Sequence, residues 1–186
     1  MERKEGWSPA QAAAAVSAAA LLGLLLPIAL RNEWSHLLAP APPGPWLRAS
    51  LAGKEELVWA HFLAILPNNL GILLLAALGM PHLARLLRRA PRSLPLIYVT
   101  AVGFSAGIVL TPAGMPYWGL AYTVLSLPYA LPELAAYTAA GLFGQARVLG
   151  KPPPWRLLLL ALGLLLLAAL VEAAVIAAVW ERRAPR

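Results

Sequence analysis

The stretch LPYALPELAAYTAAGLFG, residues 127–144, carries a single charged side chain, that of Glu133, in otherwise largely apolar surroundings. A charged carboxylate at the centre of a bilayer costs about 2.5–3.5 kcal/mol on insertion scales, so such groups face protein or water rather than lipid. Pro128 and Pro132 precede Glu133, and each proline removes a backbone donor and disfavours helical geometry in the residue before it. The stretch therefore raises two questions: what surrounds it, and whether it is a regular helix.

The composition answers the first question. The chain has 186 residues, of which 60% are hydrophobic and 12% charged, and its mean hydropathy is +0.69. A soluble domain carries about 25% charged residues, so we expect an integral membrane protein. The formal net charge is +7, but basic residues flank apolar runs, as in HLARLLRRAPR at 82–92. That pattern is typical of loops on the cytoplasmic membrane face, and we expect no nucleic-acid partner.

Apolar length predicts the membrane segments, because a helix needs about 20 apolar residues to cross the hydrocarbon. Four stretches meet this requirement, at about residues 10–30, 57–80, 93–110 and 155–180. Between the last two lies 117–144, where an unbroken helix would be about 42 Å long. Because Pro128 and Pro132 fall in its middle, we predict that this fourth segment is broken, strongly kinked or re-entrant, with halves at 117–127 and 131–144.

These segments predict the fold and the membrane topology of the chain. We predict an all-α integral membrane helix bundle, a single transmembrane domain over 1–186, with about five membrane segments and a Pro-rich loop at 31–56. The N-terminus, 81–92 and 145–156 together hold nine Lys and Arg residues, and 31–56 and the C-terminus hold six. The positive-inside rule then predicts a multi-pass protein of the cell membrane with a cytoplasmic N-terminus. The totals are the same if 117–144 is re-entrant, so the side of the C-terminus stays open.

Polar side chains within the apolar segments are the candidate functional residues. Asn68 and Asn69 follow Pro67, a third expected helix break, midway along 57–80, and Glu172 lies within the last segment. Each is costly at bilayer depth and needs partners. We therefore predict that these segments converge into an intramembrane polar cluster of Asn68, Asn69, Glu133 and Glu172. Two alternatives stay open for Glu133, a hydrogen-bonded structural carboxyl and a transport or switching group, and Glu172 could instead extend toward the interface.

Small residues recur at helical spacing, which is typical of close helix packing in membranes. We assign this role to Gly103, Gly107, Ala136, Ala140, Gly141 and Gly144. GFSAG at 103–107 also matches the nucleophile-elbow pattern, but that motif needs a strand–turn–helix context and a histidine partner. The chain has no cysteine, no P-loop and no H-E-x-x-H motif, so we expect no enzymatic activity, no metal and no cofactor.

The order of these motifs over residues 57–180 resembles the stage II sporulation protein M family. That family has a paired-Asn segment, a Gly-containing helix, a Pro…Glu-Leu segment followed by small residues, and a last helix with an acid near its end. The matching positions are Asn68, Asn69, Pro128, Glu133, Gly141 and Glu172. The family often has His-Gly where this chain has Tyr129 and Ala130, so a role that needs an imidazole there does not transfer.

The resemblance implies a non-catalytic multispanning scaffold that organises a membrane complex, with a sporulation or related envelope role and a peptidoglycan-degrading partner. The alternative hypothesis is the permease subunit of a transporter driven by a separate ATPase, because many transporters build a site from polar groups beside a broken helix. Partners are expected among membrane lipids and other membrane or envelope proteins, and a homo-oligomer stays open. Transport predicts a water-accessible cavity at Glu133, whereas a scaffold predicts co-purification with a cell-wall or membrane enzyme.

Overall fold

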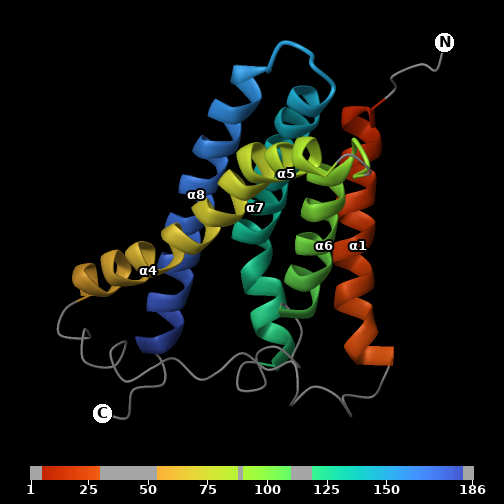
Figure 1. The fold of residues 1–186 in the computed structure, drawn as a ribbon. Helices are drawn as coiled ribbons and strands as arrows, with labels where there is room; N and C mark the ends of the chain where they lie inside the picture. Colours follow the sequence, from red (N-terminus) through yellow and green to blue (C-terminus); the bar gives the residue numbers. More distant parts are fainter. Residues whose placement is uncertain (1–5, 30–53, 88–89, 110–118, 182–186) are drawn as a thin grey trace.

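The computed structural model describes residues 6–29, 54–87, 90–109 and 119–181 (Figure 1). All regular elements in this part of the chain are helices, so the predicted all-α class is confirmed. They are α1 (Pro9–Ala29), α4 (Lys54–Leu74), the π-helix η1 (Leu75–Gly79), α5 (Met80–Leu86), α6 (Leu94–Val109), α7 (Gly119–Val148) and α8 (Trp155–Glu181). Most of the predicted Pro-rich loop lies outside the described residues, and its last three positions, 54–56, already belong to α4.

Within the described residues, three helical stretches are long and apolar enough to cross a membrane, namely Pro9–Leu26, Glu56–Leu86 and Trp155–Ala177. The apolar helix Leu94–Ile108 is shorter. Many of their leucines point outward; on α8, Leu159 is 68% exposed and Leu167 is 52% exposed. A surface this apolar suits hydrocarbon rather than water, because large exposed apolar faces are rare on soluble monomers.

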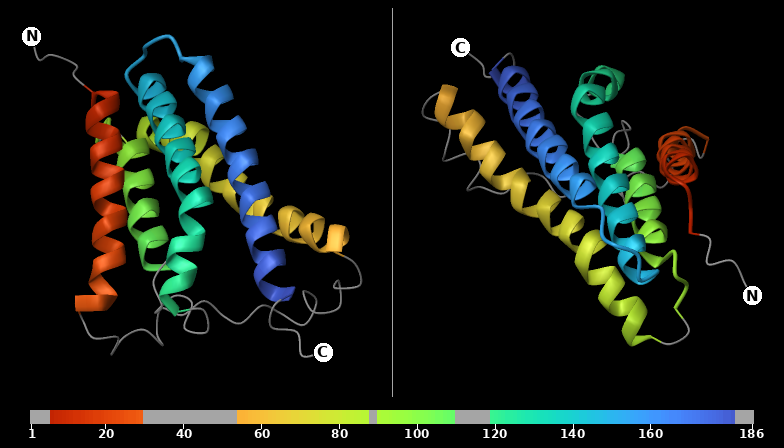
Figure 2. Two further views of the ribbon diagram at one scale, coloured as in Figure 1. Left: turned by 180° about the vertical axis from the view of Figure 1, so that it is seen from behind. Right: turned by 90° about the horizontal axis from the view of Figure 1, so that it is seen from above.

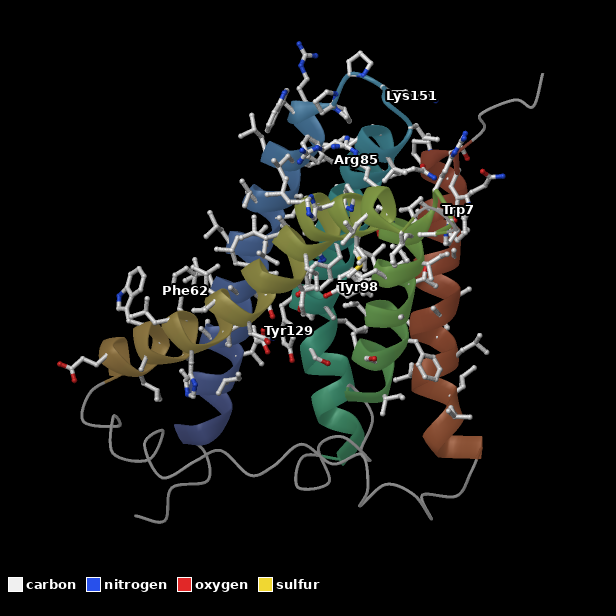
Figure 3. The ribbon with its side chains drawn as sticks, in the orientation of Figure 1. Trp7, Phe62, Arg85, Tyr98, Tyr129 and Lys151 are labelled. Atoms are coloured by element: carbon white, nitrogen blue, oxygen red, sulfur yellow. The ribbon has the colours of Figure 1, made fainter. Side chains whose placement is uncertain are left out.

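The helices α1, α6, α7 and α8 lie side by side, and the continuous rod α4–η1–α5 runs obliquely past α8, α7 and α6 (Figures 1 and 2). One end of the bundle holds the start of α1, the end of α5, the start of α6, and the connection between α7 and α8. Trp7, Arg85 and Lys151 lie at this end (Figure 3). Here the Arg85 Nη2 donates a 2.7 Å hydrogen bond to the carbonyl of Arg147, which joins α5 to the end of α7.

The prediction that 117–144 is broken or re-entrant is wrong for the described residues. The helix α7 runs without interruption through Pro128 and Pro132 and passes from one end of the bundle to the other (Figure 1). The two prolines are four residues apart, so they share one face and the lost donors leave only the carbonyls of Val124 and Pro128 without their helical partners. Packing against neighbouring helices supports such an interrupted hydrogen-bond ladder within membranes.

Pro67 does not break its helix either. α4 continues through it and is extended past the expected end at Met80 by η1 and α5. Pro67 is exposed, so its ring points away from the bundle, and the missing donor leaves the carbonyl of Leu63 on the same outer side. The irregularity lies instead at η1, a π-helical turn of the kind often found at functional sites.

The least apolar of the long helices, α7, occupies the centre. It packs against α8, α6, α1, η1, α5 and α4, and its side chains Ala136, Tyr137, Ala140 and Phe143 are buried at 0–1% exposure. Because protein rather than lipid covers most of α7, it can carry polar groups that a lipid-facing helix could not.

Glycines permit the closest approaches between helices. A Cβ on Gly23 of α1 would meet the carbonyl oxygen of Phe104, and a Cβ on Gly107 of α6 would meet the carbonyl oxygen of Ala20. A Cβ on Gly103 would lie 3.0 Å from the carbonyl oxygen of Val16. Each helix places glycine against the backbone of the other. The backbones of α1 and α6 therefore lie closer together than larger residues would allow.

Glycines also allow α7 to pack closely against η1 and α6. A Cβ on Gly144 would meet the carbonyl of Ala76 in η1, and one on Gly141 would lie 3.0 Å from the side chains of Leu96 and Val99.

The side-chain amide of the buried Gln145 holds the segment before α1. In the orientation that satisfies both of its atoms, the amide oxygen accepts from the backbone N–H of Trp7 at 3.0 Å and the amide nitrogen donates to the backbone carbonyl of Trp7 at 3.1 Å.

Candidate functional site

A cavity of about 500 Å³ lies between α4, α6, α7 and α8. Its polar lining comes from all four helices: Asn68, Asn69, Ser105, Tyr129, Glu133, Tyr137 and Glu172. Its apolar walls are Ala64, Ile65, Ile72, Val102, Ala106, Ala130 and Leu134. The structure therefore places the four residues of the predicted polar cluster, from three segments distant in sequence, on the wall of one cavity.

Glu133 lies near the midpoint of the 30-residue α7, roughly 20 Å from either end of the helix. Its Oε1 accepts a 2.6 Å hydrogen bond from the hydroxyl of Tyr137, one turn further along α7. Tyr137 is only 1% exposed, so the bond fixes the carboxyl on the cavity wall. The partner of Glu133 is thus a side chain on its own helix and not a backbone group freed by a proline.

The paired amides of α4 bond to each other rather than to Glu133. The Nδ2 of Asn68 donates to the Oδ1 of Asn69 at 3.2 Å. Asn68 is exposed, whereas Asn69 is 5% exposed. Within the described residues the Nδ2 of Asn69 has no acceptor, so this buried amide presents an unused donor in the lining of the cavity.

Glu172, on α8, lines the same cavity as Glu133. It lies nine residues before the end of α8 at Glu181, which places it about 14 Å inside the helix. Neither a hydrogen bond nor an ion pair to its carboxyl is found among the described side chains. The alternative that Glu172 extends toward the interface stays open.

The charge of the lining is one-sided. Among the described residues, the lining contains two carboxyls and no Lys, Arg or His. The basic residues Arg85, Arg147 and Lys151 lie instead at the end of the bundle, where Figure 3 shows Arg85 and Lys151. Negative charge on this cavity is therefore balanced by protons or by a cation from outside the described part of the chain.

GFSAG is a helix contact rather than a nucleophile elbow. Gly103 and Gly107 face α1, while the Oγ of Ser105 donates to the carbonyl of Ala101 one turn earlier, at 3.1 Å. No histidine lies in the cavity lining around Ser105. Among the described residues no group of three or more His, Cys, Asp or Glu side chains could hold a metal ion.

The sequence reasoning missed the aromatic part of the site. Tyr129 and Tyr137 stand four residues before and after Glu133, so the three share one stripe of α7. Tyr129 is 3% exposed and packs with Ala168 of α8, on the side of α7 that faces the cavity (Figure 3). The four-residue spacing around the acid was the signal that could have identified both tyrosines.

Comparison with protein-family models, with curated proteins and with solved structures finds no match to this chain. The resemblance to the stage II sporulation protein M family therefore stays a prediction that rests on the motifs alone.

Proposed function

We propose that this chain is the permease subunit of a membrane transporter that is driven by a separate ATPase. The observation that carries the proposal is the 500 Å³ cavity, with Glu133, Glu172 and Asn69 in its wall. A bundle that serves only to hold partners gains nothing from two carboxyls inside a membrane cavity, since each is costly there. In a permease, both carboxyls would contact the solute that enters the cavity.

The chain has no P-loop and so does not bind ATP through that motif. We propose that a partner subunit hydrolyses ATP and that the helices around the cavity respond to it. The continuous rod α4–η1–α5 is the element suited to that response. It crosses the other helices obliquely and contains a π-helical turn where α7 packs through Gly144.

The proposed orientation follows from charge. Residues 1–8, 81–92 and 145–156 carry nine of the fifteen Lys and Arg residues of the sequence. The described parts of these three segments lie at one end of the bundle (Figure 1). We place that end, and the N-terminus, on the cytoplasmic side of the cell membrane. With α7 crossing the bundle once, the C-terminus lies on the opposite side.

A scaffold for a membrane complex is the second candidate, and one feature favours it. The first half of α4 extends beyond α8 (Figures 1 and 2) and exposes large apolar side chains, with Trp59 58% and Leu63 64% exposed. A partner helix could pack there. In the family that this chain resembles, such a partner is a peptidoglycan-degrading enzyme.

Purification of the tagged protein from its native membranes separates the two proposals. The permease proposal expects a stoichiometric ATP-hydrolysing subunit, with ATP hydrolysis that changes when Glu133→Gln is introduced. Glu56→Gln is the matched control, because Glu56 is an exposed carboxyl on α4 outside the cavity. Recovery of a cell-wall enzyme and no ATPase would contradict the permease proposal and favour the scaffold.

A further inference from the structure

We propose that the cavity binds a small organic cation, an ammonium compound with an apolar body. This inference rests on the proposed function, since it names the class of solute that the permease would take. Three features of the cavity carry it: one-sided charge, aromatic and aliphatic walls, and a buried amide without an acceptor.

The first feature is the charge. Glu133 and Glu172 come from different helices, and the lining residues that the structure describes include no basic side chain. Carboxyl groups that face one another at membrane depth repel when both are ionised, and an opposite charge placed between them relieves that repulsion. An entering anion would add to the repulsion. The cavity therefore selects for positive charge.

The second feature is the wall material. Tyr129 and Tyr137 flank Glu133 on α7, and aromatic faces attract ammonium groups through the ring quadrupole. Seven aliphatic residues complete the walls. A bare inorganic ion prefers a compact shell of oxygen ligands, which a cavity of about 500 Å³ with mostly aliphatic walls does not form. An organic cation uses both the carboxyls and the apolar surface.

The third feature is independent of the acids. Asn69 is 5% exposed and its Oδ1 is occupied by the Asn68 amide, while its Nδ2 has no acceptor within the described residues. Among the described residues, the fully enclosed side-chain polar atom without a partner is the Nε2 of His61, so the Asn69 nitrogen keeps some exposed surface. This donor lies in the lining of the cavity, where a guest with a hydroxyl or carbonyl oxygen, or the water that accompanies it, would satisfy it.

The test measures binding of benzyltrimethylammonium to the purified full-length protein in detergent by isothermal titration calorimetry, with benzenesulfonate as an anion of similar size. We expect saturable binding of the cation and none of the anion. Glu133→Gln and Glu172→Gln should each weaken binding about tenfold or more, because each removes one partner of a buried charge pair. Glu56→Gln should leave the affinity unchanged. Thermal unfolding of each variant checks that the Gln proteins are folded.

Several results would overturn the inference. These are no saturable binding of benzyltrimethylammonium, equal affinity for benzenesulfonate, or unchanged affinity in both Gln variants while they remain folded. Displacement of the probe by Na⁺ at equal concentration would assign the site to an inorganic cation instead. If the ATPase subunit co-purifies but the cation does not bind, the permease proposal stands and only this inference fails. If no ATPase is found but the cation binds, the permease proposal fails and cation binding in the cavity stands.

Discussion

The crossing of α1 and α6 gives a prediction whose sign and size follow from the structure. A methyl group added in Gly107→Ala would meet the carbonyl oxygen of Ala20 and lie 2.9 Å from the backbone nitrogen of Leu24. Because both neighbours are backbone atoms, no side chain can rotate away, and α1 and α6 must separate. Overpacking of this kind costs about 1–3 kcal/mol, while alanine gains up to about 1 kcal/mol over glycine in a helix. When the full gain is subtracted from the cost, we expect a net loss of up to about 2 kcal/mol in unfolding free energy.

Gly163→Ala is the matched control, because a Cβ on Gly163 of α8 has nothing within 4 Å. This variant should gain up to about 1 kcal/mol from helix propensity alone. Unfolding in detergent, followed by circular dichroism against temperature or against added sodium dodecyl sulfate, measures both. A Gly107→Ala protein as stable as Gly163→Ala would refute the close backbone contact between α1 and α6.

Three further predictions concern α7. Tyr137→Phe removes the 2.6 Å bond to Glu133 and should lower stability by about 1–3 kcal/mol, measured by thermal unfolding; an unchanged midpoint would show that water replaces the hydroxyl without loss. Glu133→Gln should keep the protein folded in membranes and abolish activity in a deletion strain, whereas normal complementation would assign Glu133 a structural role. Gln145→Leu removes both bonds to the backbone of Trp7 and should cost about 1–2 kcal/mol. Amide exchange at Trp7 should then be faster, and unchanged exchange would disprove the tether.

The helices were predictable where an apolar run alone defines them. α1, α6 and α8 begin and end within about one residue of the ranges expected from hydropathy and length, 10–30, 93–110 and 155–180. The polar residues of the site were predictable for the same physical reason, since an acid or an amide within such a run needs a partner. Asn69, Glu133 and Glu172 do meet at one cavity.

The course of the chain at the prolines was not predictable from local rules. Proline disfavours a helix interior by about 3 kcal/mol in water, which argues for breaks at Pro67, Pro128 and Pro132. In the structure, α4 continues through Pro67 and α7 continues through Pro128 and Pro132, because both helices pack against their neighbours. Nor could local rules give the cavity, because its space depends on the oblique course of α4 past α7 and α8, which involves residues far apart in sequence.

The central claim is that a water-accessible cavity containing two carboxyls, and not a sealed core, lies within the bundle. The chain has no cysteine, so single cysteines can be placed on an unmodified background. Val102 lines the cavity, while its neighbour Ala101 is exposed on the outer side of α6 at nearly the same depth.

In native membranes a charged, membrane-impermeant methanethiosulfonate reagent should modify Val102→Cys and leave Ala101→Cys unmodified, because reaction requires a thiolate and therefore water. Both proteins should react fully once they are denatured. Modification of neither variant in the membrane, or of both at the same rate, would contradict the cavity and the function proposed from it.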